Sequence, residues 1–261
     1  MKFSIVQDSR VGARRSNQDR VGHWQTGNAL LMVLADGMGG HLHGEIAAEL
    51  AVECLAAEFR QEAQPRLASP ERFLLRSIGR AHSVILRQAE KLGLPESPRT
   101  VIVACVVQEG HAYWAHVGDS RLYLVHQGRI VARTRDHSRV QQLIDAGRIR
   151  EEAAAAHPER NQLLQCLGGD IAPRLAPVAS ARLARDDVVL LCSDGFWGPL
   201  TQRQLVHALA IRELPQAIAE LAALAEIRAG PECDNVSVVA MAWGEEEIVP
   251  STAPHRNAGS Q

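Results

Sequence analysis

The chain has 261 residues, of which 46% are hydrophobic, and a formal net charge of −2. This length suits one large domain or two small ones, and the apolar fraction can build a sizeable core, which argues against a disordered chain. The near-neutral charge gives no reason to expect nucleic acid or an anionic membrane as a partner. No apolar run approaches about 20 residues, so the sequence predicts no transmembrane helix.

The first residues and the cysteines favour a cytoplasmic protein. Residues 1–10, MKFSIVQDSR, lack the apolar stretch and cleavage site of a signal peptide. The chain has five cysteines: Cys54, Cys105, Cys166, Cys192 and Cys233. They are far apart, form no C-x-x-C pair, and most of them lie in apolar segments. We therefore expect reduced core thiols rather than a disulfide or zinc framework.

Apolar patterns predict alternating groups of strands and helices along the first half of the chain. A buried strand is expected at 30–35, followed by two long helices at 44–62 and 70–92, whose apolar residues recur three to five positions apart. Three more strands are expected at 100–107, 112–117 and 121–125, and Gly128 in the polar turn HQGRI, 126–130, indicates a hairpin.

The second half adds an insertion, more core elements and a tail. Residues 137–171 are polar and partly helical, and we expect them to form a small insertion over one edge of the core. A strand at 187–192, two helices at about 201–209 and 214–228, and a strand at 235–243 follow; residues 245–261 read as a flexible tail. Successive strands without a helix between each pair argue against βαβ units and favour antiparallel sheets covered by helices, an α/β (α+β) fold.

Aspartates recur where apolar runs meet loops, and they are the candidate functional residues. Asp36, Asp119, Asp194 and Asp234 all hold such positions, and Asp19 is a fifth candidate. Aspartate is common at strand ends and turns, which accounts for any one of them. If the four converge, they cannot all stay ionised unaided, and oxygen-only ligands favour hard cations such as Mg²⁺ or Mn²⁺ over zinc.

Five ordered motifs resemble the PP2C-like (PPM) metal-dependent serine/threonine phosphatases of the bacterial type. They are RRSNQDR (14–20), ADGMGGH (35–41), VGDSRLYLV (117–125), LLCSDGFW (190–197) and CDNVSVV (233–239). Residues 135–147 and 157–161 also resemble the flap of that branch. The resemblance spans residues 2–243 and implies one phosphatase domain, 1–244, built as a sandwich of two antiparallel sheets flanked by helices. It also implies an active site at one end of the sandwich. The polar character of residues 137–171 and their place next to DHS suggest a mobile flap that contacts protein substrates rather than the phosphate.

The resemblance also implies a role for each matched residue. Asp36 would bridge two metal ions, and the carbonyl oxygen of Gly37 would bind one of them. Asp194 and Asp234 would complete the shell of the other, while Asp19 would act mainly through metal-bound water. A water held between the two ions would attack the phosphorus without a phosphoenzyme.

Two further matches concern the substrate phosphate and a third ion. Arg14 matches the arginine that holds the phosphate, although the adjacent Arg15 leaves a one-residue ambiguity. Asp119 matches an aspartate that, with Asp194, holds a third and weaker ion; the alternative is that Asp119 simply pairs with Arg121 at a turn.

The chain departs from the family pattern at two places. Met38 stands where some members carry a histidine proposed to protonate the leaving group, so the general acid is unassigned. His41 and His43 are close to it, and we interpret them as ordinary loop residues. The usual Met-Gly-Thr-Thr before the central strand is SPRT here, of which only Thr100 is kept. This change should alter a loop and a strand start, not the metal ligands.

Two alternative functions fit the sequence less well. CLAAEFR, 54–60, fits the C-x₅-R pattern of cysteine phosphatases, but it lacks glycine and lies in a helical pattern whose N–H groups are already bonded. A catalytically inactive phosphatase fold that binds or senses should have lost metal aspartates, and all four matched positions are intact. The expected partners are phosphorylated proteins, targets of a serine/threonine kinase, and the protein is expected to be a monomer.

Overall fold

The computed structural model describes residues 1–38 and 43–244. His41 and the predicted tail, 245–261, lie outside the described residues. The described elements are, in chain order, β1 (Phe3–Arg10), β2 (Asp19–Gln25), β3 (Ala29–Gly37), α1 (Gly44–Glu62), α2 (Pro70–Lys91), β4 (Thr100–Gln108), β5 (His111–Val117), β6 (Arg121–His126), β7 (Arg129–Arg133), α3 (Arg139–Asp145), η1 (Glu151–Ala156), β8 (Ala179–Arg182), β9 (Val188–Cys192), α4 (Asp194–Trp197), α5 (Gln202–Ile211), α6 (Leu214–Ala229), η2 (Gly230–Glu232) and β10 (Val236–Trp243).

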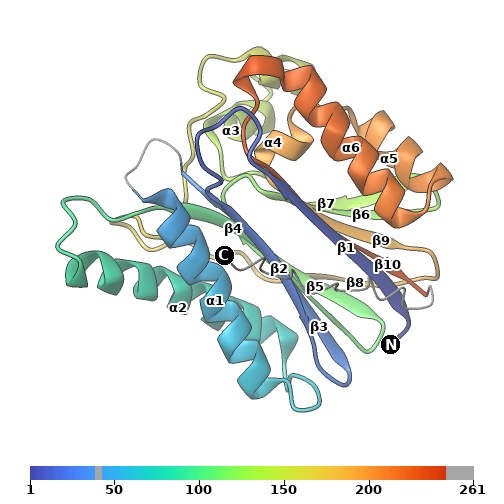
Figure 1. The fold of residues 1–261 in the computed structure, drawn as a ribbon, viewed down its shortest axis with the longest axis horizontal. Coiled ribbons are helices and arrows are strands. Elements are labelled where there is room, and N and C mark those ends of the chain that lie inside the picture. The colour runs from blue at the N-terminus through green and yellow to red at the C-terminus, as the bar shows by residue number, and fades with distance from the viewer. Residues whose placement is uncertain (39–42, 245–261) are drawn as a thin grey trace, which may run out of the picture.

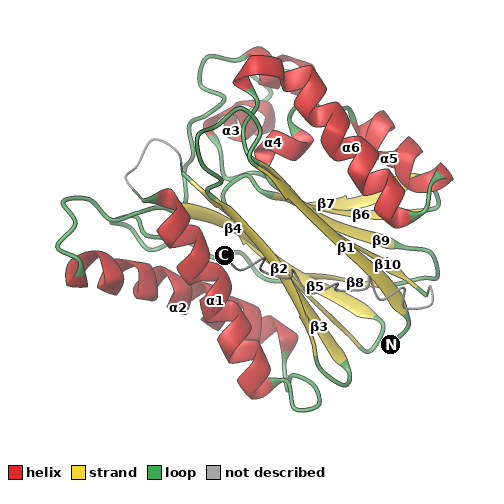
Figure 2. Ribbon diagram, in the orientation of Figure 1, coloured by secondary structure: helices red, strands yellow, loops and turns green. Residues whose placement is uncertain are grey.

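The strands form two five-stranded antiparallel sheets that pack face to face. The first has the order β1-β10-β9-β6-β7 and the second the order β2-β3-β4-β5-β8. Helices α1 and α2 cover the outer face of the second sheet, and α5 and α6 cover the outer face of the first (Figures 1 and 2). The expected sandwich of two antiparallel sheets flanked by helices is therefore confirmed.

Three apolar layers hold this arrangement together. Phe59 and Phe73 lie between the two long helices and their sheet, and Phe196 lies between the other sheet and its helices. Met32 and Leu191 lie between the two sheets. Because β3, β4, β9 and β10 are apolar on both faces, they occupy the centres of the sheets, where each face meets another layer.

The predicted helices and most predicted strands are confirmed within one to three residues. The expected helix at 44–62 matches α1 at both ends, and the expected helix at 70–92 begins at Pro70, after Ser69, whose hydroxyl accepts a hydrogen bond from the Arg72 N–H. The hairpin around Gly128 joins β6 to β7. The strands at 3–10 and 19–25, which are β1 and β2, were not predicted from the sequence.

The predicted insertion at 137–171 contains α3 and η1, and it is tied to itself and to the core. Ser138 pairs with Leu163 in an isolated bridge, so the segment closes on itself. Thr100, the first residue of β4, exchanges both backbone hydrogen bonds with Leu167, at 3.2 and 2.8 Å. The segment is therefore anchored where the central strand of the second sheet begins. In the described part of the chain, no helix is long and apolar enough to cross a membrane.

Candidate metal centre

Two of the five aspartates meet on the second sheet. Asp19 is the first residue of β2, and Asp36 is the last but one of β3. The antiparallel register of these strands places Asp19 and Asp36 directly opposite each other. Asp19 is only 3% exposed, so its carboxyl group is buried beside that of its neighbour.

The other three aspartates lie next to strand ends at the same end of the first sheet. Asp194 follows β9 and opens α4, while Asp234 precedes β10. Asp119 precedes β6, whose first residue, Arg121, lies opposite Cys192 at the end of β9. The antiparallel pairing of β10, β9 and β6 therefore brings all three acids to one end of the sheet.

The two groups converge across the sandwich. The charges of Asp19, Asp194, Asp119 and Asp234 all act on Asp36, and the Asp194 side chain shares a hydrogen bond with it. The convergence that the sequence left open is thus present in the fold.

Close backbone approaches at two glycines make this convergence possible. A Cβ atom on Gly37 would lie 2.5 Å from the carbonyl carbon and oxygen of Gly44, at the start of α1. A Cβ atom on Gly195 would lie 2.2 Å from the carbonyl oxygen of Asn235. These glycines are needed because other chain segments press against them. At Gly37 glycine is therefore required by the close contact with Gly44.

Burial and clustering make the metal-free carboxylates costly to ionise. Burial, followed by the charges of the other acids, raises the pKa of Asp36 and of Asp119 well above the usual value. Burial also raises the pKa of Asp19 to about 7, with Asp194 and Asp234 adding to the effect, and that of Asp194 to about 6. An arrangement this costly to ionise calls for more positive charge than the neighbouring side chains supply.

The donor set suits hard divalent cations. One buried oxygen, Oδ2 of Asp19, has no hydrogen-bond partner, and a bound ion or its water would satisfy it. Within residues 1–38 and 43–244, no three His, Cys, Asp or Glu side chains are arranged to enclose one ion together. Each ion would thus take few protein ligands and complete its shell with water, as Mg²⁺ commonly does.

Arg14 lies at the edge of this cluster and contacts one of its acids. Its Nε and Nη2 atoms donate to Oδ1 and Oδ2 of Asp234 at 2.9 and 2.7 Å, and its side chain remains 56% exposed. The predicted phosphate ligand and a predicted metal ligand are therefore paired with each other. Asn235 fastens the loop that carries Arg14, because its Nδ2 donates to the carbonyl oxygens of Val11 and Ser16 at 2.9 and 3.0 Å.

Three supporting residues were not recognised in these roles from the sequence. Asn235 is one, and Thr100 is another, since its hydroxyl donates to the carbonyl oxygen of Asp36 at 2.7 Å. Trp197 is the third, with its indole N–H donating to the carbonyl oxygen of Asp119 at 3.0 Å. Each of them contacts a main-chain atom of a residue distant in sequence. Such contacts leave no local sequence pattern from which they could be predicted.

The suggested turn pair between Asp119 and Arg121 is not the arrangement found. The Arg121 guanidinium instead makes two hydrogen bonds to Asp136, from Nε at 2.9 Å and from Nη2 at 2.8 Å. Asp119 is therefore left without this counter-charge contact.

Neither the cysteine motif nor the nearby histidine supplies chemistry here. Cys54 lies inside α1, and burial raises the pKa of its thiol to about 11, with Glu58 adding to the effect, so the reactive thiolate is disfavoured. His43 precedes α1, and its Nδ1 lies 3.8 Å from Oε1 of Glu45. This contact agrees with the interpretation of His43 as a loop residue.

Comparisons with known proteins agree with this geometry. A sequence model of the family described as Protein phosphatase 2C matches residues 6–226. A putative protein phosphatase 2C-type from Streptococcus pyogenes serotype M6 is 34% identical over 255 residues, which are 95% of this chain and 100% of that protein. The serine/threonine protein phosphatase PstP of Mycobacterium tuberculosis is 35% identical over 235 residues, 90% of this chain but 43% of PstP, so this chain spans less than half of that relative.

A solved structure shares the fold over nearly the whole chain. It is the catalytic domain of the serine/threonine protein phosphatase PstP in complex with two manganese ions, and it superposes with a TM-score of 0.77. The two sequences are 31% identical, and the superposition covers 92% of this chain and 98% of the other. The ordered motifs, the two-sheet sandwich, the converging acids and these matches lead to one conclusion: the chain belongs to the protein phosphatase 2C family.

Proposed function

We propose that this protein removes phosphate from phosphoserine and phosphothreonine in proteins, using water and divalent metal ions, without a covalent phosphoenzyme. One observation carries the proposal: five aspartates from both sheets converge, and among the described residues only Asp234 of the five has an ion-pair partner, Arg14. The named phosphatases among the relatives and the manganese-bound neighbour support it. An inactive binding module would not need to keep this costly set of acids.

The carboxylates have distinct proposed roles. Asp36 and the Gly37 carbonyl oxygen would hold two ions, Mn²⁺ or Mg²⁺, with Asp194 and Asp234 completing one shell and Asp19 acting through bound water. When bound, the ions lower the pKa of water toward neutrality and offset charge on the phosphoryl group. Thr100 fixes the backbone of Asp36, so this carboxylate is held in place before any ion arrives.

Arg14 is the proposed ligand of the substrate phosphate. Its planar guanidinium can fork onto two phosphate oxygens, as it now does onto the two oxygens of Asp234. A metal ion and Arg14 therefore compete for Asp234, and an ion bound there would free Arg14 for the substrate.

Substrate, assembly and location follow the same proposal. The substrates are proteins phosphorylated by a serine/threonine kinase, and the protein acts as a monomer in the cytoplasm. All five cysteines are free, which fits a reducing compartment.

Metal removal and replacement test the proposal. The purified protein is exhaustively chelated, and phosphate release from a phosphothreonine peptide is followed while Mn²⁺ or Mg²⁺ is returned. Hydrolysis should be abolished by chelation and restored by either ion. Full activity after chelation, or no release with saturating metal, would refute the metal-dependent function.

A further inference from the structure

Trp197 joins the two segments that carry Asp194 and Asp119. It is the last residue of α4, the single turn that Asp194 opens. Its indole Nε1–H donates to the carbonyl oxygen of Asp119 at 3.0 Å, across 78 positions of sequence. The indole therefore sets how far apart the two aspartate-bearing segments lie.

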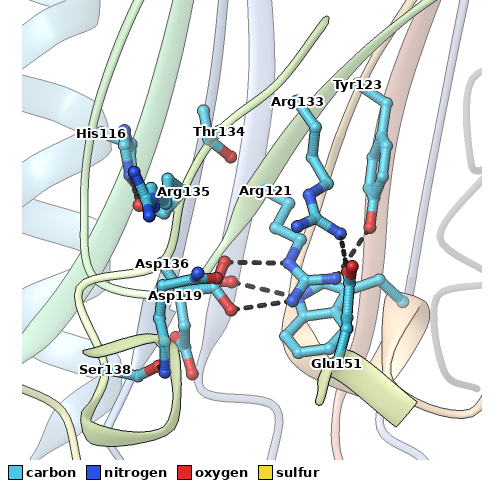
Figure 3. A network of polar contacts seen from close by, with 12 residues as sticks. His116, Asp119, Arg121, Tyr123, Arg133, Thr134, Arg135, Asp136, Ser138 and Glu151 are labelled. Carbon is cyan, nitrogen blue, oxygen red and sulfur yellow. Dashed lines mark hydrogen bonds and ion pairs between the residues drawn. The ribbon is translucent and has the colours of Figure 1, made fainter. Parts of the chain in front are cut away.

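Arg121 holds the indole in place from one face. Its guanidinium carbon lies 3.3 Å from the centre of the Trp197 ring, a close cation–π contact. Two hydrogen bonds to Asp136, described above, and a third from Nη1 to the hydroxyl oxygen of Tyr123 at 3.0 Å fix the plane of the guanidinium (Figure 3). Arg121 and Asp136 are only 13% and 8% exposed, so this contact is shielded from water and holds Trp197 firmly.

The same network is bound to the start of the insertion. His137 follows Asp136 directly, and its N–H donates to the carbonyl oxygen of Gly118 at 2.8 Å. In return, the Gly118 N–H donates to Nδ1 of His137 at 3.1 Å. Arg133 adds a bond from Nη1 to Oε1 of Glu151 at 2.6 Å (Figure 3). The residue before Asp119 is therefore fixed as well, so Asp119 is supported on both sides.

We propose that Trp197 and Arg121 are positioning residues for the third, weaker metal ion, because they hold Asp119 at a fixed separation from Asp194. This inference rests on the proposed function. Neither residue touches phosphate or the reacting water; both act through the main chain of Asp119. Asp119 lies just before β6 and Asp194 just after β9, and these neighbouring strands place Arg121 opposite Cys192, so the two aspartates lie at the same end of the sheet. A cation that takes few protein ligands depends on their spacing, and outer partners of metal ligands commonly change affinity about 10- to 100-fold.

The test replaces Trp197 by phenylalanine, which keeps an aromatic face for Arg121 and removes the N–H donor. Binding of Mn²⁺ is measured by the paramagnetic resonance signal of the free ion, alongside hydrolysis of a phosphothreonine peptide. We expect the two tighter ions to be unchanged and the weak ion to bind about tenfold less tightly. The Mn²⁺ concentration for half-maximal turnover should rise by the same factor, with an unchanged KM for the peptide.

Trp24→Phe is the matched control, because Arg60 lies over the Trp24 ring at 5.7 Å, on the side of the sandwich covered by α1. This variant should bind Mn²⁺ as the wild type does. In an Asp119→Ala background, Trp197→Phe should produce no further change in Mn²⁺ binding, because the group that it positions is gone. If Trp197→Phe does not fold, Arg121→Lys replaces it and should shift the weak ion in the same direction.

Three results would overturn the inference: an unchanged Mn²⁺ titration in folded Trp197→Phe, an equal shift in Trp24→Phe, or a persistent shift in the Asp119→Ala background. A wild type that hydrolyses the peptide but binds no weak third ion would also overturn it, and would leave the proposed function standing. A wild type that neither binds Mn²⁺ nor hydrolyses the peptide would overturn both.

Discussion

Two groups of acids lie at the same end of the sandwich, and they differ in their counter-charges. Asp136 is nearly buried, and both of its oxygens accept hydrogen bonds from Arg121. Asp19 is as deeply buried, yet one of its oxygens has no partner and the charges that act on it are those of other acids. The first arrangement is complete as it stands, whereas the second is satisfied only when something else binds.

This difference separates a structural ion pair from a binding site. Burying an unpaired charge costs several kcal/mol, so a fold retains such an arrangement only where a ligand offsets the cost. Removing a carboxylate should therefore have opposite effects on metal-free stability in the two groups. Four predictions test the contrast, from the largest expected effect to the smallest.

The largest effect is expected when the unpaired cluster is changed. Asp36→Asn or Asp194→Asn should lower turnover by roughly 10³-fold or more, because several kcal/mol of charge stabilisation by the metal are lost. In the presence of a chelator, the same variants should melt at a higher temperature than the wild type, because repulsion among the acids is relieved. Turnover and thermal unfolding with and without Mn²⁺ measure both. Cys54→Ser is the control and should keep most turnover; a folded but inactive Cys54→Ser protein would contradict the metal assignment.

Breaking the paired group should destabilise the protein. Asp136→Asn leaves the buried Arg121 charge without its partner, and we expect the free energy of unfolding to fall by about 3 kcal/mol. Denaturant titration of the metal-free protein measures the change. The ion pair between Asp145 and Arg135 is more exposed than the Asp136–Arg121 pair. Asp145→Asn breaks it and should cost less than about 1 kcal/mol. Equal losses in the two variants would show that Asp136 behaves as a surface residue.

Arg14 links the unpaired cluster to the substrate. Arg14→Gln should raise the KM for a phosphothreonine peptide roughly 10- to 100-fold, as expected for loss of a charged hydrogen bond. It should also tighten metal binding about two- to fivefold, because the exposed Arg14–Asp234 pair no longer competes for the carboxylate. Peptide kinetics and Mn²⁺ titration test the two effects. Arg15→Gln is the neighbouring control, and a larger KM change there would move the phosphate ligand by one residue.

The smallest effect concerns pH and the start of the insertion. Burial, and then the charge of stacked His116, lower the pKa of His137 to about 4, although Asp136 acts the other way. A lowered folded-state pKa means that stability is present above the unfolded value, near 6.5, and is lost as the pH falls toward 4. Between pH 7.5 and 5.0 His137 should contribute a loss of about 1 kcal/mol, allowing for solvent screening of its half-exposed ring.

His137→Asn isolates this contribution. The asparagine Oδ1 can accept the hydrogen bond from the Gly118 N–H, but the side chain does not titrate. The difference in unfolding free energy between the variant and the wild type should therefore change by about 1 kcal/mol between these pH values. The clustered aspartates titrate in both proteins and cancel in the comparison. Parallel pH curves for the two proteins would show that His137 does not titrate between its two expected values.

The sequence by itself determined the layer architecture and the identity of the candidate acids. The apolar runs at β3, β4 and β9 are continuous, whereas a strand with one exposed face alternates apolar and polar residues. They therefore indicated strands at the buried centres of the sheets. The regular apolar spacing in α1 and α2 predicted both helices within one residue. Asp36, Asp119, Asp194 and Asp234 stood out because each interrupts the chain where such a run meets a loop.

Only the tertiary structure revealed the edge strands and the partners of the acids. Strands β1 and β2 each pair with one neighbour, and their mixed burial leaves no continuous apolar run to recognise, although β2 carries Asp19. Arg121 lies two residues from Asp119 but pairs with Asp136, fifteen residues away. Trp197 reaches Asp119 across 78 positions. Local spacing sets which side chains can lie on one face, whereas strand register and loop closure decide which charges meet, and these depend on contacts distributed over the whole chain.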